Sequence, residues 1–343
     1  MKLGLILGYS GANLHIDIDL IKEAEKLGFD SVWTAEAWGS DAVTPLAWIA
    51  AQTTTIKLGT AIMQVPGRSP ANAAMTAMTL DALSGGRFMM GLGTSGPQVV
   101  EGWHGKPFRK PLTWLQEYVS IVKTILAREQ KLEFDGEHYQ IPYTGPGSTG
   151  QGKPLKSILH GRPNIPIYTG SMAPKSQAWC AEVADGCLLT CMNPERPEAI
   201  YENLDRGFAK AGGGKGLNNG FDLAPSVACI LGDDLDSLRM PLKFSLALYA
   251  GGMGSRKTNF YNAYLRRAGF EEEAVKIQDL YLAGDKQGAM AAVTDEMVDT
   301  LYLVGSKERI RDRFQVWKES GVGTLIVGTA QPEALRLLAE LNS

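Results

Sequence analysis

Residues 3–34, LGLILGYSGANLHIDIDLIKEAEKLGFDSVWT, contain the first repeat of the fold. Two short β-rich runs, Leu3–Leu7 and Ser31–Thr34, enclose a helical pattern in which apolar residues from Ile16 to Leu27 recur every three or four positions. Gly28 ends this helix, since glycine readily adopts the left-handed conformation of a C-cap. A strand, a helix and a second strand in this order predict a parallel βαβ unit.

The same alternation continues to the end of the chain. Helical patterns, the strongest from Trp114 to Leu126, separate six further β-rich runs: Ile56–Met63, Arg87–Leu92, Ile165–Tyr168, Gly186–Cys191, Pro225–Leu231 and Thr324–Val327. Eight strands favour a closed (β/α)8 barrel over an open doubly wound sheet. No GxGxxG motif opens the first helix, where a dinucleotide-binding fold would place it. We therefore predict an α/β protein with a (β/α)8 TIM barrel.

The length of the chain fits one barrel with additions. A minimal barrel needs about 250 residues, and the chain has 343. Stretches rich in glycine and proline, and a long helical excursion, interrupt the repeat after strands four and seven. We expect a single domain over residues 1–343, with insertion segments at about 131–164 and 251–299.

Charge and composition exclude several classes of partner. With 34 Lys and Arg against 37 Asp and Glu, the formal net charge is −3, so no basic surface for nucleic acid is indicated. No apolar run reaches the roughly 20 residues needed to span a membrane, and no signal peptide is evident. Four cysteines in so long a chain do not make a disulfide framework. We expect a cytoplasmic enzyme that acts on a small molecule.

In a barrel of this kind the active site is built from the loops that follow the strands. After strand five, Thr169-Gly170-Ser171-Met172 leads into a helix, and such a turn suits a phosphate, although an ordinary helix start fits equally well. After strand two comes Glu36, which could accept hydrogen bonds from a ligand or serve only the loop structure. His104 could be a general acid, but a packing role is the simpler interpretation. The histidines and cysteines lack metal-ligand spacing, so no metal site is predicted.

The order and spacing of several short motifs resemble the bacterial luciferase-like monooxygenase superfamily, and within it the deazaflavin-dependent oxidoreductases related to methylene-tetrahydromethanopterin reductase. The motifs are LGFDSVW at 27–33, TAEAW at 34–38, KLGTA at 57–61, LSGGRF at 83–88 with GLG at 91–93, and VGS at 304–306. The resemblance implies coenzyme F420, or less often FMN, across the mouth of the barrel. It also implies a homodimer or higher homo-oligomer.

The resemblance assigns further roles residue by residue. The cofactor ring would lean on a bulge in strand three with a non-proline cis peptide at Ala61–Ile62. Glu36 would lie near the ring, and Gly93, Thr94, Ser95 and Gln98 would follow the ring and ribityl chain. Thr169, Gly170, Ser171 and Met172 would hold the phosphate. Residues expected to surround the substrate are Tyr9, Trp38, Gln64, Trp103 and His104.

One position departs from the pattern. Sugar-phosphate dehydrogenases of this family carry a histidine, the proposed proton acceptor, directly after the strand-two acid. Here that position is Ala37, which argues against the oxidation of glucose-6-phosphate or a simple alcohol. We therefore expect hydride transfer between the deazaflavin and an unsaturated or carbonyl substrate, with Glu36, His104 and Tyr9 as candidate catalytic residues. Two alternatives stay open, an FMN-dependent monooxygenase that uses reduced flavin and oxygen, and a non-catalytic protein that binds the cofactor.

Overall fold

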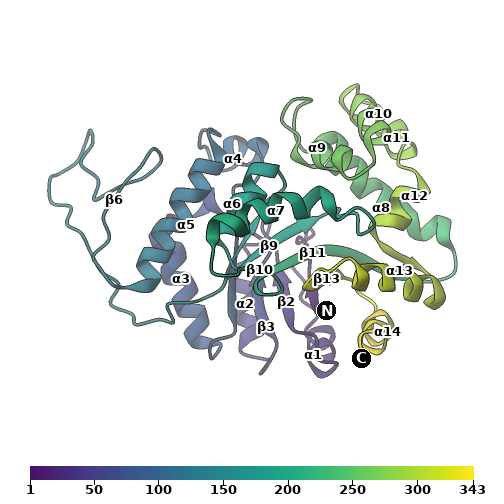
Figure 1. Cartoon of the computed structure of the whole chain (residues 1–343), viewed down its shortest axis with the longest axis horizontal. Coiled ribbons are helices and arrows are strands. Elements are labelled where there is room, and N and C mark those ends of the chain that lie inside the picture. The colour runs from purple at the N-terminus through teal and green to yellow at the C-terminus, as the bar shows by residue number, and fades with distance from the viewer. The chain divides into compact units, whose positions relative to one another are not determined.

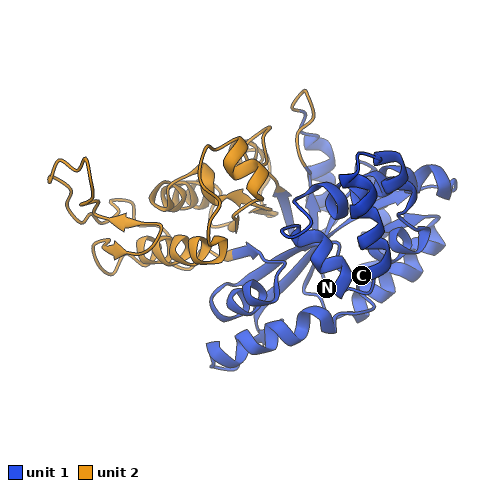
Figure 2. Ribbon diagram, turned by 90° about the horizontal axis from the view of Figure 1, so that it is seen from above, with its two compact units in different colours: residues 1–8, 15–33, 168–343 blue, residues 9–14, 34–167 orange.

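The computed structural model describes residues 1–343 (Figure 1). Contacts among these residues group them into two compact units, which Figure 2 colours separately. Unit 1 consists of Met1–Gly8, His15–Trp33 and Tyr168–Ser343, and unit 2 of Tyr9–Leu14 and Thr34–Ile167. The strands β2 and β8 cross the boundary between the units, because Thr34 ends β2 and Ile167 begins β8.

The long strands of unit 1 are all parallel. In the order of their pairing they are β2 (Ser31–Thr34), β1 (Lys2–Ile6), β13 (Thr324–Gly328), β11 (Gly220–Leu231), β9 (Gly186–Thr190) and β8 (Ile167–Gly170). Two short strands, β10 (Gly216–Leu217) and β12 (Leu303–Gly305), pair with the two ends of β11.

In unit 2, β5 (Phe88–Gly93) pairs in parallel with β3 (Lys57–Thr60) and then with β4 (Met63–Gln64). The Ala61 N–H donates to the Thr34 carbonyl, at the end of β2, over 2.7 Å, and the Met90 N–H donates to the Pro166 carbonyl over 2.8 Å. The ring order is thus β1-β2-β3-β5-β8-β9-β11-β13, with β13 returning to β1. This is the predicted (β/α)8 barrel.

Helices separate every strand of the ring from the next. Those before β8 are α1 (Ile18–Lys26), α2 (Val43–Ala50), the 3₁₀ turn η1 (Val65–Gly67), α3 (Pro70–Leu83), α4 (Pro97–Gly102) and α5 (Pro111–Ala127). Those after it are α6 (Pro174–Val183), α7 (Glu198–Ala211), α8 (Leu235–Ala247), the π-helix η2 (Leu248–Gly252), α9 (Phe260–Arg267), α10 (Glu271–Leu282), α11 (Lys286–Ala291), α12 (Asp295–Leu301), α13 (Lys307–Glu319) and α14 (Pro332–Asn342).

All eight predicted strands are present, but the limits of some differ. The predicted strand Ile56–Met63 is interrupted at a cis Ala61–Ile62 peptide bond, so that β3 and β4 are separate strands. The fifth strand begins at Ile167 rather than Ile165, and β11 begins at Gly220 rather than at the predicted Pro225. Neither limit follows from hydrophobicity, because Ile165 is apolar but lies outside β8, and Asp222 is charged but lies inside β11.

The helix limits follow the capping signals closely. Gly28 has a φ of 83° directly after the C-cap of α1, as its position predicts. The Ser306 hydroxyl accepts a hydrogen bond from the Arg309 N–H and begins α13, and that of Ser69 does the same for α3.

A buried indole organises the barrel interior in unit 1. Trp33 on β2 donates from Nε1 to the Ser31 hydroxyl over 2.8 Å, and its ring meets that of Tyr168 edge-on at 5.4 Å. A Cβ on Gly4 would lie 3.0 Å from Trp33 Nε1 and from Ser31 Oγ, so a larger residue on β1 would crowd the indole.

In unit 2, the SGGR motif at residues 84–87 joins the end of α3 to β5. Gly85 and Gly86 have φ values of 68° and 84°, which are rare for other residues. The turn directs the Arg87 guanidinium to carbonyls of Ala50, Thr53, Ile56 and Ser84. This one side chain therefore fixes the loop between α2 and β3 against the start of β5.

Both predicted insertion segments have structure of their own. Segment 131–164 contains the antiparallel hairpin of β6 (Phe134–Asp135) and β7 (Gln140–Ile141), whose turn is held by the Glu117 carboxylate through the backbone N–H groups of residues 137–139. Segment 251–299 contains α9–α11 and most of α12, which pack with η2 and α8 around a second apolar core.

All four cysteines are free and buried. The predicted strand Gly186–Cys191 would include both Cys187 and Cys191. Cys191 instead lies one residue beyond β9 with a φ of 58°, a left-handed conformation that removes it from the strand alternation.

Candidate functional site

The Glu36 carboxylate is fixed in place just beyond β2. Glu36 is 9% exposed. Its Oε1 accepts from the Gln64 N–H at 2.6 Å and from Arg68 Nη1 at 2.7 Å, and its Oε2 accepts from the Ala42 N–H at 2.9 Å. The carboxylate thus joins the ends of β2 and β4 to the start of α2. Protein donors therefore bind both oxygens of this carboxylate.

A second set of hydrogen bonds runs outward from Glu36. The buried Gln64 side chain donates from Nε2 to the Glu36 backbone carbonyl at 3.0 Å and to the Ser95 hydroxyl at 3.4 Å. Its Oε1 lies 2.6 Å from His104 Nε2. His104, Gln64 and Glu36, predicted from three separate loops, therefore belong to one polar network.

The cis peptide bond between Ala61 and Ile62 lies where the resemblance implied it. Beside it, Gly93 at the end of β5 lies against the Ile62 side chain, and a Cβ on Gly93 would be 3.0 Å from Ile62 Cγ1 and 3.1 Å from Cδ1. Glycine at position 93 therefore leaves the space that the Ile62 side chain fills.

The loop from Thr94 to Gly96 connects β5 to α4, which contains Gln98. Ser95 has a φ of 62°, which a residue other than glycine seldom adopts, and this conformation goes with its contact to Gln64. The Thr94 hydroxyl donates to the Ser95 carbonyl at 3.4 Å, and the Gln98 side chain is exposed on α4.

The predicted aromatic residues are exposed. Tyr9, Trp38 and Trp103 are 55%, 59% and 65% exposed, large values for such side chains. The loop of Tyr9 and that of Trp38 are adjacent, because the Ser40 N–H donates to the Ser10 hydroxyl at 2.9 Å. None of the three belongs to the Glu36 network.

In unit 1, β8 leads through the predicted phosphate turn into α6. Thr169 and Ser171 are buried and their hydroxyls lie 3.0 Å apart, whereas Gly170 is exposed. Ala173 at the N-cap of α6 makes no side-chain capping bond. The first N–H groups of a helix have no acceptor within the helix, so this end of α6 suits an anion.

Two arginines that the sequence analysis did not single out also contact the predicted residues, Arg68 at Glu36 and Arg267 at Met172. Arg68 binds Glu36 and lies 3.7 Å from Asp41, and it follows η1 in a Pro-Gly-Arg-Ser-Pro stretch that reads as a plain turn. Arg267, at the end of α9, donates to the Met172 carbonyl at 3.0 Å. Arg267 belongs to the insertion and is 95 residues from Met172 in the sequence. Neither hydrophobic periodicity nor a local motif predicts a contact over such a separation.

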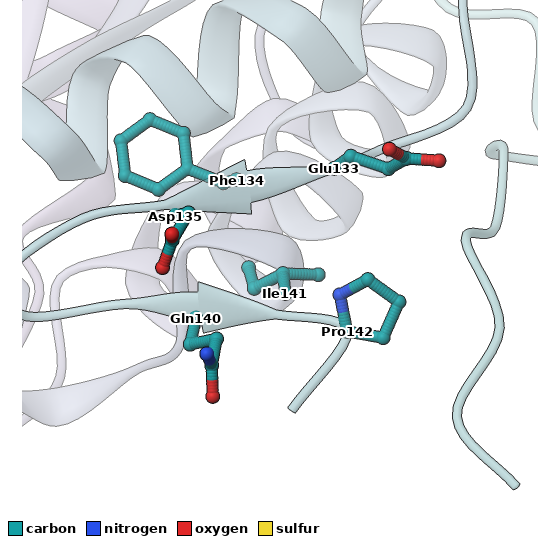
Figure 3. A pocket seen from close by; sticks show the side chains of 6 residues that line it. All are labelled: Glu133, Phe134, Asp135, Gln140, Ile141 and Pro142. Atoms are coloured by element: carbon teal, nitrogen blue, oxygen red, sulfur yellow. The ribbon is translucent and has the colours of Figure 1, made fainter. Parts of the chain in front are cut away.

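Other features of the structure lie outside this network. A hollow of about 320 Å³ opens beside the β6–β7 hairpin, between Phe134, Ile141 and their neighbours (Figure 3). No group of three or more His, Cys, Asp or Glu side chains is arranged to hold a metal ion. None of the helices combines the length and the apolar composition needed to cross a membrane.

Comparisons with known proteins agree in fold and family. A 43% identical relative, over 343 residues and 99% of both chains, is the "Putative coenzyme F420-dependent oxidoreductase Rv3520c" of Mycobacterium tuberculosis. The 5,10-methylenetetrahydromethanopterin reductase of Archaeoglobus fulgidus is 29% identical over 315 residues, 90% of this chain and 88% of its own.

Two solved structures share the fold. The coenzyme F420-dependent tetrahydromethanopterin reductase of Methanopyrus kandleri superposes with a TM-score of 0.78 at 24% identity, over 99% of this chain and 97% of that one. The oxygenating constituent of 3,6-diketocamphane monooxygenase from Pseudomonas putida, in complex with FMN, gives 0.66 at 18% identity over the same shares. The model of the luciferase-like monooxygenase family matches residues 3–324. The chain therefore belongs to the luciferase-like monooxygenase family.

Proposed function

We propose that this protein is an F420-dependent oxidoreductase that transfers a hydride between the deazaflavin and a small organic substrate. Membership of the luciferase-like monooxygenase family over residues 3–324 carries the proposal, and the bulge at Ala61–Ile62, packed against Gly93, is where the resemblance implies that the cofactor ring would lean. The preference for F420 over FMN is supported by the 43% identical relative, whose name specifies F420.

The residues of unit 2 fit the ring part of such a cofactor. Gly93 is buried against the Ile62 side chain, and this packing supports the bulge on which the ring would lean. Gln64 and Glu36 are locked by their mutual hydrogen bonds, so their positions would change little on binding. A rigid support of this kind holds reacting atoms in one geometry.

The turn at Thr169–Met172 fits the phosphate. Its exposed Gly170 and the uncapped start of α6 offer backbone N–H groups, and the mutual bond of Thr169 and Ser171 keeps the turn in shape. Arg267 adds a positive charge through its bond to the Met172 carbonyl. Bound F420 would supply the carbon that accepts or donates the hydride, and the protein would supply position and exclusion of water.

Titration of the purified protein with F420 and with FMN, followed by fluorescence, tests this proposal. We expect saturable binding of F420 and much weaker binding of FMN. Tight FMN binding without F420 binding would overturn it in favour of the monooxygenase function, which the FMN-bound neighbour of the same fold supports. Binding of F420 without turnover on a panel of alcohols, ketones, enones and imines would indicate a carrier protein instead.

The phosphate assignment has its own variant. Gly170→Asp puts a negative charge and a side chain into the turn, and we expect it to abolish F420 binding through repulsion and steric blocking. Gly216→Asp is the matched control, because a Cβ at Gly216 meets nothing within 4 Å and its φ is not left-handed. Unchanged affinity in Gly170→Asp would show that the turn is only structural.

A further inference from the structure

The orientation of one side-chain amide determines which nitrogen of His104 carries a proton. Gln64 is 2% exposed, and its Nε2 lies 3.0 Å from the Glu36 backbone carbonyl. A carbonyl oxygen only accepts hydrogen bonds, so the NH₂ group of Gln64 must face it. The amide oxygen Oε1 then faces His104 Nε2, at 2.6 Å.

The consequence for the imidazole follows from the same rule. Because Gln64 Oε1 is also a pure acceptor, His104 Nε2 must be the donor of this hydrogen bond. In the neutral ring the other nitrogen, Nδ1, then has the free lone pair. No residue of the structure hydrogen-bonds to His104 Nδ1, and the side chain is only partly buried.

The charges around His104 favour its neutral form. Burial lowers the pKa of the imidazole, and the ammonium of Lys106 after α4 and the guanidinium of Arg68 after η1 lower it further, against an opposing effect of Glu36 beyond β2. Lys106 is itself held by the Pro66 carbonyl at 2.8 Å. A neutral imidazole with a free Nδ1 is a proton acceptor.

We infer that Gln64 holds His104 as the Nε2–H tautomer, so that His104 Nδ1 exchanges the hydroxyl proton of an alcohol–carbonyl substrate pair. This inference rests on the proposed function, which supplies F420 as the hydride partner. In the oxidative direction the alcohol C–H hydrogen leaves with its electron pair to the deazaflavin. The hydroxyl proton goes to Nδ1, and the O–H electron pair becomes the second bond of the carbonyl. Gln64 is then a positioning residue and His104 a catalytic residue.

The choice of an alcohol–carbonyl pair follows from two features of the network: a free lone pair on His104 Nδ1, and the hydrogen bonds that already occupy its other polar groups. The free lone pair at Nδ1 needs a donor on the substrate, and a hydroxyl group provides one next to the carbon that loses hydride. The Glu36 oxygens already accept from Arg68 and from the N–H groups of Ala42 and Gln64. The Gln64 side-chain amide is bonded to the Glu36 carbonyl and to His104. His104 is therefore the group of this network that can accept the proton.

Nitrogen NMR of the protein without cofactor tests the tautomer directly. The chain has four histidines, so selective ¹⁵N labelling gives a simple spectrum, and His104→Asn assigns the signal. We expect protonated Nε2 and unprotonated Nδ1, with a titration midpoint below the ordinary histidine value. In Gln64→Glu the added charge should raise this midpoint while keeping the tautomer, and in Gln64→Leu the tautomer preference should weaken. Gln52→Leu, whose amide contacts only the Trp48 carbonyl, is the control.

These measurements separate the inference from the proposed function, because they need no cofactor. A protonated Nδ1 in the wild type, or a His104 titration unaffected by both Gln64 variants, overturns the tautomer inference even if F420 binds. With F420 bound, we expect kcat/KM for secondary alcohols to fall about 100-fold or more in His104→Asn. In Gln64→Glu we also expect the pH profile of kcat/KM to shift to higher pH, as the NMR titration midpoint of His104 does. Turnover of enones but not of alcohols or ketones overturns the substrate class.

Discussion

Arg68 Nη1 lies 2.7 Å from Glu36 Oε1, and both side chains are largely buried, with 18% and 8% of their surfaces exposed. The pair joins the loop after η1 to the loop after β2. A buried ion pair costs stability when only one partner is removed, since the other charge is left without a partner.

We expect Glu36→Ala to lower the free energy of unfolding by about 3 kcal/mol, because it leaves Arg68 and the N–H groups of Ala42 and Gln64 without their acceptor. Arg68→Met should have a smaller effect. Urea denaturation of both variants and of the double variant measures the coupling, and a double variant as unstable as the sum of the two would contradict it.

Gly93→Ala tests the packing at the bulge. The new methyl group would lie 3.0 Å from the Ile62 side chain, and we expect a loss of about 1–3 kcal/mol of stability. Gly102→Ala in α4 is the matched control, since nothing lies within 4 Å of its Cβ. Thermal unfolding compares the two. Combining Gly93→Ala with Ile62→Ala should cost less than the sum of the separate changes, and strict additivity would argue against the contact.

The left-handed conformation of Ser95 predicts an unusual gain. Ser95→Gly should raise the stability by up to about 1 kcal/mol, because glycine adopts a φ of 62° without strain. Ser95→Ala keeps the strain and loses the 3.4 Å contact to Gln64, so it should be no more stable than the wild type. Denaturation curves that rank alanine above glycine would sink the explanation.

Asp41, just before α2, should make the free energy of unfolding depend on pH in the acidic range. Burial opposes its charged form, but hydrogen bonds from Thr44 and Val43 and the nearby Arg68 lower its pKa on balance. Its charge therefore stabilises the fold above the unfolded value of 3.8, and this contribution is lost as the pH falls through the lower folded value. The stability difference between wild type and Asp41→Asn should shrink in that range. A difference that stays constant with pH would count against the charge effect.

The buried thiols should be unreactive in the folded protein. Burial raises the pKa of Cys191 to about 11 and that of Cys229 to about 12. Since the thiolate is the reactive form, neither should react with a disulfide reagent near neutral pH until the protein unfolds. Counting released chromophore with and without denaturant checks this, and rapid native labelling of either cysteine would refute it.

Much of this architecture was predictable because it depends on local patterns. The helix that ends at Gly28 and the helix that begins at Ser306 follow from capping chemistry within a few residues. The interruption of the third strand does not show in hydrophobicity, since Ala61 and Ile62 continue the apolar run. It was expected only through the family resemblance.

The members of the polar network were singled out in the sequence, but their connections were not. Glu36, Gln64 and His104 were each singled out from the loops that contain them, yet the hydrogen bonds that join them depend on how β2, β4 and α4 meet. Arg68 was overlooked because the turn that contains it has no sequence feature typical of a functional site. Ala37 stands where related dehydrogenases have a histidine as proton acceptor, but the neighbouring Glu36 belongs to a network that contains another histidine, His104.

Because β11 pairs with β12, the insertion segment 251–299 lies between two neighbouring strands. The chain leaves the barrel after β11 and returns at β12, where Cys229 and Leu303 are direct partners in parallel register. Its entry and exit are thus neighbouring strands about 5 Å apart, and its helices close around their own apolar core. A segment attached in this way can change in length or sequence without altering the barrel strands, because its ends stay on two paired strands.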